Sequence, residues 1–227
     1  MSDIRFEQVG QRFGDRSVLR DVNLSLTEHR IGIVGANGSG KSTLVRMING
    51  LVTPTTGTVL VDGQNVARHA RDVRRKVGFI FTNPDNQIVM PTVQEDVAFT
   101  LRRRGLSPAE IARRTAAALE QFGLSEHAEH PAHRLSGGQK QLLALAAVLV
   151  AEPATIVADE PTTLLDARNA RRIGDLLHTL PQQVIVVTHH LHLVEEFDRV
   201  IVIDEGTVVA DGTPGESLAT YRALLLA

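Results

Sequence analysis

A glycine-rich stretch near the start of the chain has the spacing of a phosphate-binding loop. Gly35, Gly40, Lys41 and Ser42 match the pattern Gly-x4-Gly-Lys-Ser. Glycines let successive backbone N–H groups point at one anion, and a helix beginning at Lys41 would add its positive dipole end. Lys41 would reach the outer phosphates of a nucleotide, and the Ser42 hydroxyl could ligate Mg²⁺. The predicted ATP-binding loop consists of Gly35, Ala36, Asn37, Gly38, Ser39, Gly40, Lys41, Ser42 and Thr43.

An acidic pair, Asp159 and Glu160, follows the apolar segment 154–158. A phosphate-binding loop needs a second acid on a neighbouring strand to hold Mg²⁺, and we expect Asp159 to do so directly or through water. Glu160 lies one residue further on, where it could orient and deprotonate an attacking water. Taken alone, such a pair is more often a capped or solvated strand end. The phosphate-binding loop on the same chain favours the catalytic interpretation.

His189 follows the apolar run 184–187 and Thr188. At the end of a strand, its imidazole could hydrogen-bond the γ-phosphate and hold Glu160 and the water in place. The alternative is an ordinary surface histidine, since the chain has nine histidines. We predict the catalytic role.

A second loop, at 135–139, precedes a helical pattern that begins near Lys140. It presents backbone N–H groups and one hydroxyl at the start of that helix. Alone, this sequence is compatible with an ordinary capped helix, so its meaning depends on the rest of the chain. The loop residues are Leu135, Ser136, Gly137, Gly138 and Gln139.

Alternating strand and helix patterns must position these residues. The segment 31–34 is apolar throughout, as in a strand buried on both faces, and leads directly into the glycine loop. Ser107 and Pro108 begin a helix with a capping box, and Gly123 ends it. Further along we predict strands and helices in turn at 155–158, 167–180, 184–187, 191–197 and 200–203. This alternation indicates an α/β fold with a mostly parallel sheet, interrupted by a helical insertion.

The amino-acid composition excludes several classes of protein. The 227 residues include 24 Lys+Arg and 26 Asp+Glu, a balance unlike that of a dedicated nucleic-acid binder. The absence of Cys excludes disulfides, Cys-type zinc sites, iron–sulfur clusters and thiol nucleophiles. No run approaches the ~18 apolar residues of a membrane span. The first residues lack a signal-peptide pattern. We therefore expect a soluble, cytoplasmic chain that reaches a membrane only through another protein.

Taken together, these segments resemble the ATP-binding subunits of ABC transporters over essentially the whole chain. The resemblance implies a P-loop NTPase core, with a RecA-like mostly parallel sheet and an N-terminal antiparallel β segment, plus an ABC helical subdomain. It implies one ABC ATPase domain over 1–227, with the core at 1–83 and 151–227 and the helical subdomain at about 84–150. The matching motifs are the Walker A loop at 35–42, the signature at 135–139, the Walker B strand at 155–159 with Glu160, a D-loop at 161–166 that ends in Asp166, the switch His189, and Phe13 as the aromatic that stacks on adenine.

The resemblance also implies a dimer. In the family, each ATP lies between the Walker A loop of one subunit and the signature loop of the other. This chain carries one intact copy of each motif, which favours a homodimer with two competent sites. ATP would close the dimer and hydrolysis would reopen it.

The segment 77–87 is similar to the energy-coupling-factor type of ABC ATPase, which serves vitamin and transition-metal uptake. That type carries Gln where this chain has Thr82, just before Asn83-Pro84-Asp85. The glutamine normally touches Mg²⁺ and the attacking water, whereas the shorter threonine could act through a bridging water. A second departure is Leu142, where the family usually has Arg.

Within this type, Thr82, the short C-terminal part and the run 5–9 are most similar to the ATPases of bacterial biotin transporters. The implied partners are a BioN-like transmembrane coupling protein and a BioY-like substrate-binding membrane protein, at the cytoplasmic face of the bacterial inner membrane. No nucleic acid and no direct membrane insertion are expected. The transmembrane partner would dock in a hydrophobic groove between insertion and core, lined by 83–93 and the helix after Thr92.

Two alternatives remain open. One is the ATPase of a cobalt or nickel importer, since nothing in such a subunit touches the transported solute. The other is a soluble ABC ATPase of iron–sulfur cluster assembly, which has a compatible size. A P-loop small-molecule kinase would leave the loop at 135–139 and His189 unexplained.

Overall fold

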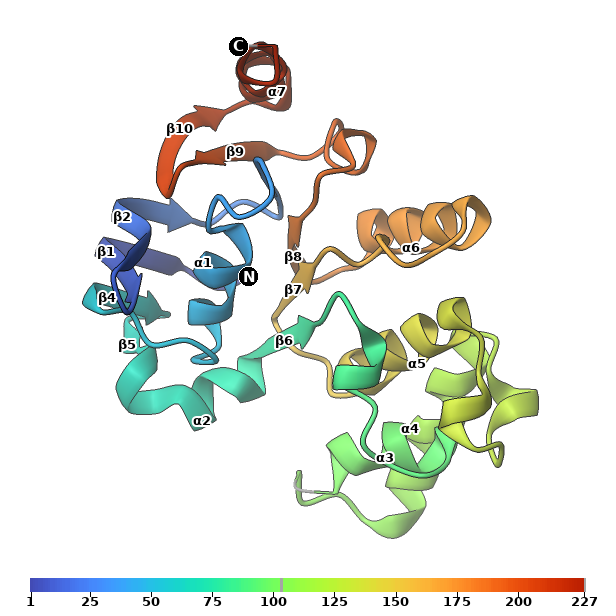
Figure 1. Ribbon diagram of the computed structural model, residues 1–227. Coiled ribbons are helices and arrows are strands. Elements are labelled where there is room, and N and C mark those ends of the chain that lie inside the picture. Colours follow the sequence, from blue (N-terminus) through green and yellow to red (C-terminus); the bar gives the residue numbers. More distant parts are fainter. Residues whose placement is uncertain (103, 227) are drawn as a thin grey trace. The chain divides into compact units, whose positions relative to one another are not determined.

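Two β-sheets and seven α-helices make up the computed structural model, which describes residues 1–102 and 104–226 (Figure 1). One sheet is antiparallel, with strand order β2-β1-β4-β5. Ile4 lies opposite Leu26 on one neighbouring strand and opposite Val61 on the other, and all three side chains are buried. The strands are β1 (Ile4–Phe13), β2 (Arg16–Leu26), β4 (Thr56–Val61) and β5 (Gln64–Asn65).

The second sheet has the order β10-β9-β3-β8-β7-β6. Strand β3 pairs in parallel with β8 and β9, and β7 pairs in parallel with β8, while β10 is antiparallel to β9. Every residue of β3, β7 and β8 is buried, as expected for parallel strands covered on both faces. The strands are β3 (Arg30–Val34), β6 (Val77–Ile80), β7 (Thr155–Asp159), β8 (Gln183–Val187), β9 (Arg199–Asp204) and β10 (Thr207–Gly212).

The helices follow the sequence prediction in most places. Helix α4 starts at Pro108 as predicted, and the Ser107 side chain accepts the N–H of Glu110. The predicted capping box is incomplete, because the Glu110 carboxylate accepts from Arg113 and Arg114 instead. Helices α2 and α7 are not among the predicted elements. The α-helices are α1 (Lys41–Ile48), α2 (Val66–Lys76), α3 (Val93–Leu101), α4 (Pro108–Gln121), α5 (Gly137–Leu149), α6 (Ala167–Thr179) and α7 (Pro214–Leu224).

The predicted helix at 191–197 is wrong. The structure has only the short 3₁₀ helix η4 (Leu191–Leu193) there. Leu193, Val194 and Phe197 are buried, but two successive turns hold the chain instead of a continuing helix. Seven residues are too few for a helix that lacks strong caps. The other 3₁₀ helices are η1 (Pro84–Asn86), η2 (Ser125–His127) and η3 (Ala132–Arg134).

The described chain divides into two compact units. The first consists of Met1–Gly78, Ala154–Glu160 and His178–Ala227, and the second of Phe79–Pro153 and Pro161–Leu177. The first unit therefore contains the antiparallel sheet and nearly all of the parallel one. The second is helical and includes most of α6, which the sequence-based boundaries leave with the core.

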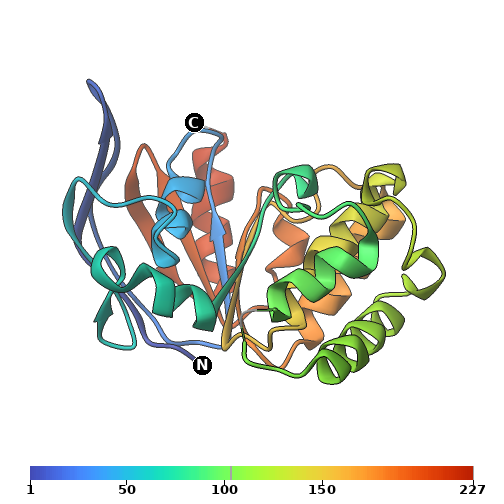
Figure 2. The ribbon, with the colours of Figure 1, turned by 90° about the horizontal axis from the view of Figure 1, so that it is seen from below.

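Helix α5 is the centre of the second unit. It packs against α3 and α4, and the three helices lie side by side in both ribbon views (Figures 1 and 2). The run Leu142–Ala147 on α5 is buried at every position. Such an all-round apolar helix is stable only when other helices cover it.

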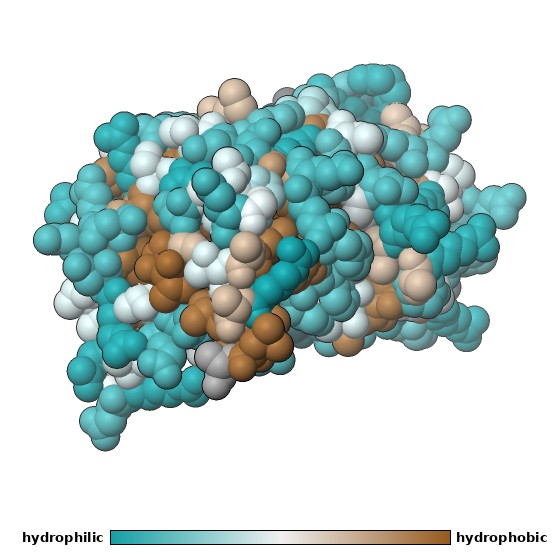
Figure 3. Space-filling model, turned by 90° about the horizontal axis from the view of Figure 1, so that it is seen from above, coloured by the Kyte–Doolittle hydropathy of each residue, from teal (hydrophilic) through white to brown (hydrophobic). Residues whose placement is uncertain are grey.

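Most of the surface drawn in Figure 3 is hydrophilic, with apolar residues confined to small areas. Within the part of the chain that the structure describes, no helix is both long and apolar enough to cross a bilayer.

Core packing around α5 gives a stability prediction. Leu143 is fully buried, whereas Leu164 in the same unit is 60% exposed. We expect Leu143→Ala to lower the free energy of unfolding by about 2–5 kcal/mol, because it removes buried methyl groups and leaves a cavity. Leu164→Ala should change that free energy by less than about 0.5 kcal/mol. Urea unfolding followed by circular dichroism measures both, and equal effects would contradict this description of the helical core.

Candidate nucleotide-binding and catalytic site

The glycine loop joins β3 to α1 in a conformation that requires its glycines. Gly35 and Gly40 have φ of 151° and 107°. A Cβ on Gly35 would lie 2.0 Å from the carbonyl oxygen of Ile203, and one on Gly40 would lie 2.8 Å from that of Val18. Gly40 is the N-cap of α1 and provides no side-chain hydrogen bond. The N–H groups of the first turn of α1 therefore lack a side-chain cap and suit an anion.

The ammonium group of Lys41 closes the loop. Its Nζ donates to the carbonyl oxygens of Gly35 and Ala36, both at 2.8 Å, and the residue is only 5% exposed. Burial lowers the pKa of Lys41, while the nearby carboxylates of Glu160 and Asp159 oppose that shift. A buried cation with two acidic neighbours is well suited to neutralise phosphate charge.

Asp159, at the end of β7, is bonded to α1 through both carboxylate oxygens. Its Oδ1 accepts the Ser42 hydroxyl at 2.7 Å, and its Oδ2 accepts Nη2 of Arg46 at 3.1 Å. The Asp159 side chain is fully buried. A hydroxyl and a carboxylate at this distance are the oxygen donors that Mg²⁺ prefers, so Ser42 and Asp159 fit a metal–nucleotide site.

Glu160 and His189 meet as the sequence predicted. Nδ1 of His189 lies 3.0 Å from Oε1 of Glu160 and 2.9 Å from Oε2. Glu160 has φ of 53°, in the left-handed region that non-glycine residues avoid, and its N–H donates to the carbonyl oxygen of Val187. This backbone conformation costs of order 1 kcal/mol, and such strain concentrates at functional sites.

A cleft of about 310 Å³ in the first unit gathers these groups. Lys41, Ser42 and Glu160 line one part of it, and Phe13, which is 54% exposed, lines another. This volume is at the lower end of the range for small-molecule sites. The complete lining is Phe13, Arg16, Val18, Asn37, Gly38, Gly40, Lys41, Ser42, Thr43 and Glu160.

Sequence reasoning missed two arginines. Arg16 lines the cleft, and its Nη2 would lie 3.5 Å from a Cβ on Gly38. Arg46 bonds Asp159 from the last turn of α1. Arg16 follows Phe13 across a tight turn, which is a weak signal at best. Arg46 lies four residues after Ser42, on the same side of the helix, and that spacing could have revealed it.

The second unit holds the loop at 135–139. Ser136 is the N-cap of α5, and it forms a capping box with Gln139. The Ser136 N–H donates to Oε1 of Gln139 at 2.9 Å, and the Gln139 N–H donates to Oγ of Ser136 at 3.3 Å. Leu135 is 7% exposed and anchors the loop in the helical unit.

The segment 161–166 lies beside that loop. The Asp166 carboxylate accepts the backbone N–H of Asn169 at 2.8 Å and the side-chain amide of Asn169 at 2.9 Å. The bond from the backbone N–H is the main reason that the pKa of Asp166 is lowered. A Cβ on Gly138 would lie 2.6 Å from the Asn169 side chain, and one on Gly137 would lie 3.9 Å from the carbonyl oxygen of Leu164. The second glycine of the loop therefore allows this close approach.

Thr82 also lies in the second unit, after β6. Gln87, five residues later, is not a substitute for the missing glutamine, because its amide is engaged elsewhere: Oε1 accepts the N–H of Phe81, and Nε2 donates to the carbonyl oxygen of Ala144. Leu142 is 5% exposed and packs in the helical core. The apolar side chain at this position is therefore a packing residue here.

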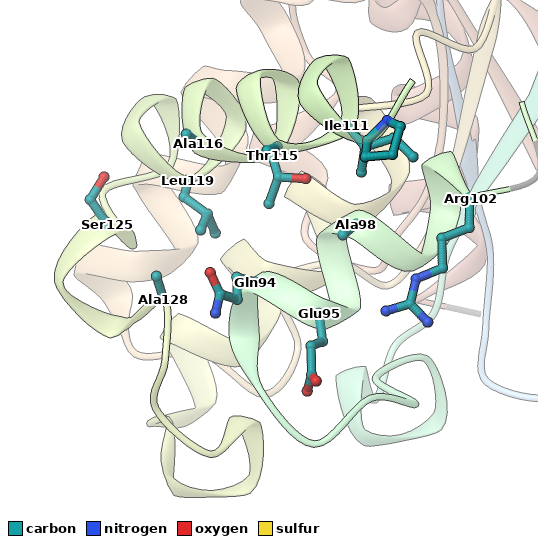
Figure 4. A pocket seen from close by; sticks show the side chains of 12 residues that line it. Gln94, Glu95, Ala98, Arg102, Ile111, Thr115, Ala116, Leu119, Ser125 and Ala128 are labelled. Carbon is teal, nitrogen blue, oxygen red and sulfur yellow. The ribbon is translucent and has the colours of Figure 1, made fainter. Parts of the chain in front are cut away.

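A hollow of about 480 Å³ lies between α3 and α4 (Figure 4). Ala98 comes from α3 and Arg102 from the residue that follows it, and Ile111, Thr115 and Leu119 come from α4. The docking groove predicted from the sequence, between the insertion and the core and lined by 83–93, is a different place: this hollow lies within the second unit, and none of its lining residues belongs to 83–93.

Fold and site together define a nucleoside-triphosphate-binding protein of the P-loop class. Comparison with known families is more specific. The model of the ABC transporter family matches residues 19–163, and the chain therefore belongs to that family. It is an ABC ATPase.

Individual relatives agree. The chain is 51% identical to a putative ABC transporter ATP-binding protein of Deinococcus radiodurans, over 96% of this chain and 97% of that protein. It is 46% identical to the biotin transport ATP-binding protein BioM of Rhizobium etli, over 98% and 99%. Relatives named as biotin transport or energy-coupling factor ATP-binding proteins match at 40–46% identity, and the chain is an ABC ATPase of the energy-coupling-factor type.

A solved structure gives the same fold. The ATP-binding cassette MJ0796, a dimer in a post-hydrolysis state with ADP and Pi bound, matches with a TM-score of 0.83 and 31% identity. The match covers 93% of this chain and 98% of that one.

The position of Arg16 gives a binding prediction. We expect Arg16→Ala to weaken ATP binding about tenfold and to reduce its salt dependence, because the variant loses a cation beside the phosphate loop. Arg12→Ala is the matched control: Arg12 lies in the same hairpin, donates to the carbonyl oxygen of Asp15 and does not line the cleft. Isothermal titration calorimetry at two salt concentrations measures both variants. Equal losses would contradict a specific role for Arg16.

Proposed function

We propose that this chain hydrolyses ATP to drive uptake of biotin through a membrane transporter of the energy-coupling-factor type. The observation that carries the ATPase part is the cleft that contains the glycine loop, Lys41, Ser42 and Glu160 together. The similarity to proteins named for biotin transport supports the solute.

In this proposal the first unit binds ATP. Phe13 stacks on the adenine ring, and the N–H groups of the glycine loop and the Lys41 ammonium hold the phosphates. Ser42 and Asp159 would hold Mg²⁺, whose positive charge would offset that of the phosphates. Arg16 adds a positive charge at the rim.

Glu160 acts as the general base. Its carboxylate accepts a proton from a water whose oxygen attacks the γ-phosphorus, and the bond to the bridging oxygen breaks to release ADP and phosphate. Nδ1 of His189 holds the Glu160 carboxylate. A hydrogen bond from Nε2 to a γ-phosphate oxygen also needs a proton on that nitrogen, so His189 would serve both groups as the imidazolium, in which both ring nitrogens donate.

The second unit supplies the other half of the site. Ser136, Gly137 and Gly138 begin α5 with a hydroxyl and N–H groups that suit the γ-phosphate of an ATP bound to another copy of the chain. Asp166 and Asn169 brace this loop from the D-loop side. The dimeric state of MJ0796 supports a homodimer that closes on two ATP molecules.

The base assignment gives a direct prediction. Glu160→Gln should retain ATP binding and lower turnover by at least about a hundredfold, because an amide cannot accept the proton. ATP and Mg²⁺ should then trap a stable dimer, which gel filtration with light scattering detects. The control is Glu195→Gln, a change at a surface residue that is distant from Glu160 in the sequence. Normal hydrolysis by the Glu160 variant would remove the base role.

Thr82 gives a second prediction. Thr82→Gln should leave ATP affinity unchanged and raise turnover several-fold at limiting Mg²⁺, because the longer amide could replace a bridging water with a direct bond worth about 1 kcal/mol. Thr82→Ser, which retains only a hydroxyl, should behave like the parent. Steady-state ATPase assays across Mg²⁺ concentrations measure the effect. Unchanged turnover for Thr82→Gln would show that the position is neutral.

The partners follow from the transport proposal. We propose that the chain binds, at the cytoplasmic face of the inner membrane, a transmembrane coupling protein of BioN type and a substrate-binding membrane protein of BioY type. The hollow between α3 and α4, which is mostly apolar with Arg102 and Glu95 at its edge, is a candidate surface for the coupling protein (Figure 4).

Purification from the native host tests the transport proposal. The tagged chain, isolated from detergent-solubilised membranes, should carry both membrane proteins, and the complex should bind labelled biotin. Binding of Co²⁺ or Ni²⁺ instead would replace biotin with a metal-ion solute. Recovery only in the cytosol with soluble partners would contradict transport and leave the ATPase chemistry intact.

A further inference from the structure

Two histidines lie next to the loop at 135–139 and have no role in the mechanism above. His127 ends η2, and His130 follows three residues later. Their Nδ1 atoms are 2.9 Å apart, which is hydrogen-bond distance, and their ring centroids are 5.0 Å apart.

The other nitrogen of His127 reaches the capping box of α5. Its Nε2 lies 2.9 Å from Nε2 of Gln139. The amide oxygen of Gln139 already accepts the N–H of Ser136. The Gln139 amide nitrogen must therefore donate to His127, and a chain of hydrogen bonds runs from His130 through His127 and Gln139 to Ser136.

Proton positions along this chain follow from the partners. Because Gln139 donates to Nε2 of His127, that nitrogen carries no proton, and the His127 proton is on Nδ1. This Nδ1–H donates to Nδ1 of His130, which must also lack a proton. Both rings are thus neutral. A second proton on His127 would be on Nε2 and would face the amide N–H of Gln139. A proton on Nδ1 of His130 would face the Nδ1–H of His127. Either proton would break the series of hydrogen bonds.

We propose that His127 and His130 are positioning residues for the capping box of Ser136 and Gln139. They hold Gln139, and through it Ser136, in the arrangement that binds ATP, and they do so only while both imidazole rings are neutral. Acid pH then weakens closure of the dimer through the signature loop. The proposal rests on the proposed function, because it assumes that Ser136 binds ATP held by another copy.

The segment 127–131 packs against the start of α3, where Val93 N–H donates to the His130 carbonyl and Gln94 N–H to that of Ala128. Two neighbouring charged side chains already have partners. Nζ of Lys140 forms an ion pair with Oδ1 of Asp85 at 2.7 Å, and the Glu95 carboxylate accepts the Thr92 hydroxyl. The charged and titratable groups on the segment and on the elements around it are Glu126 and Glu129, Glu95 and Asp96 of α3, Glu120 of α4, His133 and Arg134 of η3, and Lys140 of α5.

The test compares ATP-driven dimerisation at about pH 8 and about pH 6 in the full chain carrying Glu160→Gln. His127→Gln is the key additional change, because its amide oxygen can accept from Gln139 and does not titrate. The dimer of the Glu160→Gln parent should weaken about three- to tenfold on acidification, whereas that of the double variant should change less than about twofold. His133→Ala, on the same stretch but outside the hydrogen-bond chain, should retain the parental pH dependence. Sedimentation measures each dissociation constant, and an identical pH dependence in parent and double variant would overturn the proposal.

Two further measurements distinguish failure of this proposal from failure of the proposed function. The ATP affinity of each variant, which depends on the first unit, should equal that of the Glu160→Gln parent, and far-UV circular dichroism shows whether the helical second unit is folded. No ATP-dependent dimer of Glu160→Gln at either pH would refute the proposed function itself. Independently of any variant, ¹⁵N NMR of the histidine rings should show His127 as the neutral Nδ1–H tautomer at about pH 8, and the Nε2–H tautomer would contradict the hydrogen-bond chain.

Discussion

The rest of the nucleotide site depends on one buried carboxylate. Asp159 is fully buried, and such a charge is tolerated only if each oxygen has a partner. Ser42 and Arg46, both on α1, provide those partners and thereby connect the helix to the end of β7. This connection fixes the glycine loop between β3 and α1, and it places Glu160, the next residue, in the same cleft as Lys41. The strained backbone of Glu160 and its bond to His189 are consequences of where β7 must end.

The second unit follows a different constraint, the close packing at the start of α5. Gly138 leaves room for Asn169, which in turn bonds Asp166. The helix start therefore has its hydroxyl and N–H groups beside the Asn169 side chain, which only a glycine at 138 admits. The first unit contains the glycine loop and Glu160, the proposed base, and the second contains the loop at 135–139, the proposed contact to ATP on another copy. An ATPase in which each copy supplies both halves accounts for both constraints in one chain.

Much of this could be predicted from the sequence, because the strongest signals are local. A glycine loop between a buried strand and a helix is a specific sign of phosphate binding, and the apolar run before Asp159 identified β7 and its two acids. Ser107, Pro108 and Gly123 marked the limits of α4. Contacts between distant residues were harder to predict: Arg16 in the cleft and Asn169 against Gly138 depend on how separate elements pack, whereas the spacing of Arg46 from Ser42 was the one local sign of its bond to Asp159. The segment 191–197 misled for a related reason, since its apolar residues are buried in turns that share the spacing of a helix.

The most direct test is whether the glycine loop of one copy meets the signature loop of another. The native chain has no cysteine, so Asn37→Cys in one tagged copy and Gly137→Cys in a differently tagged copy would be the only thiols in a mixture. Asn37 is exposed, and a side chain at Gly137 meets only the carbonyl oxygen of Leu164, at 3.9 Å. We expect a disulfide between the two tagged copies that forms with ATP and Mg²⁺ and is much weaker with ADP. Chains that bind ATP without forming this bond above the level seen with ADP would contradict a site shared between two copies.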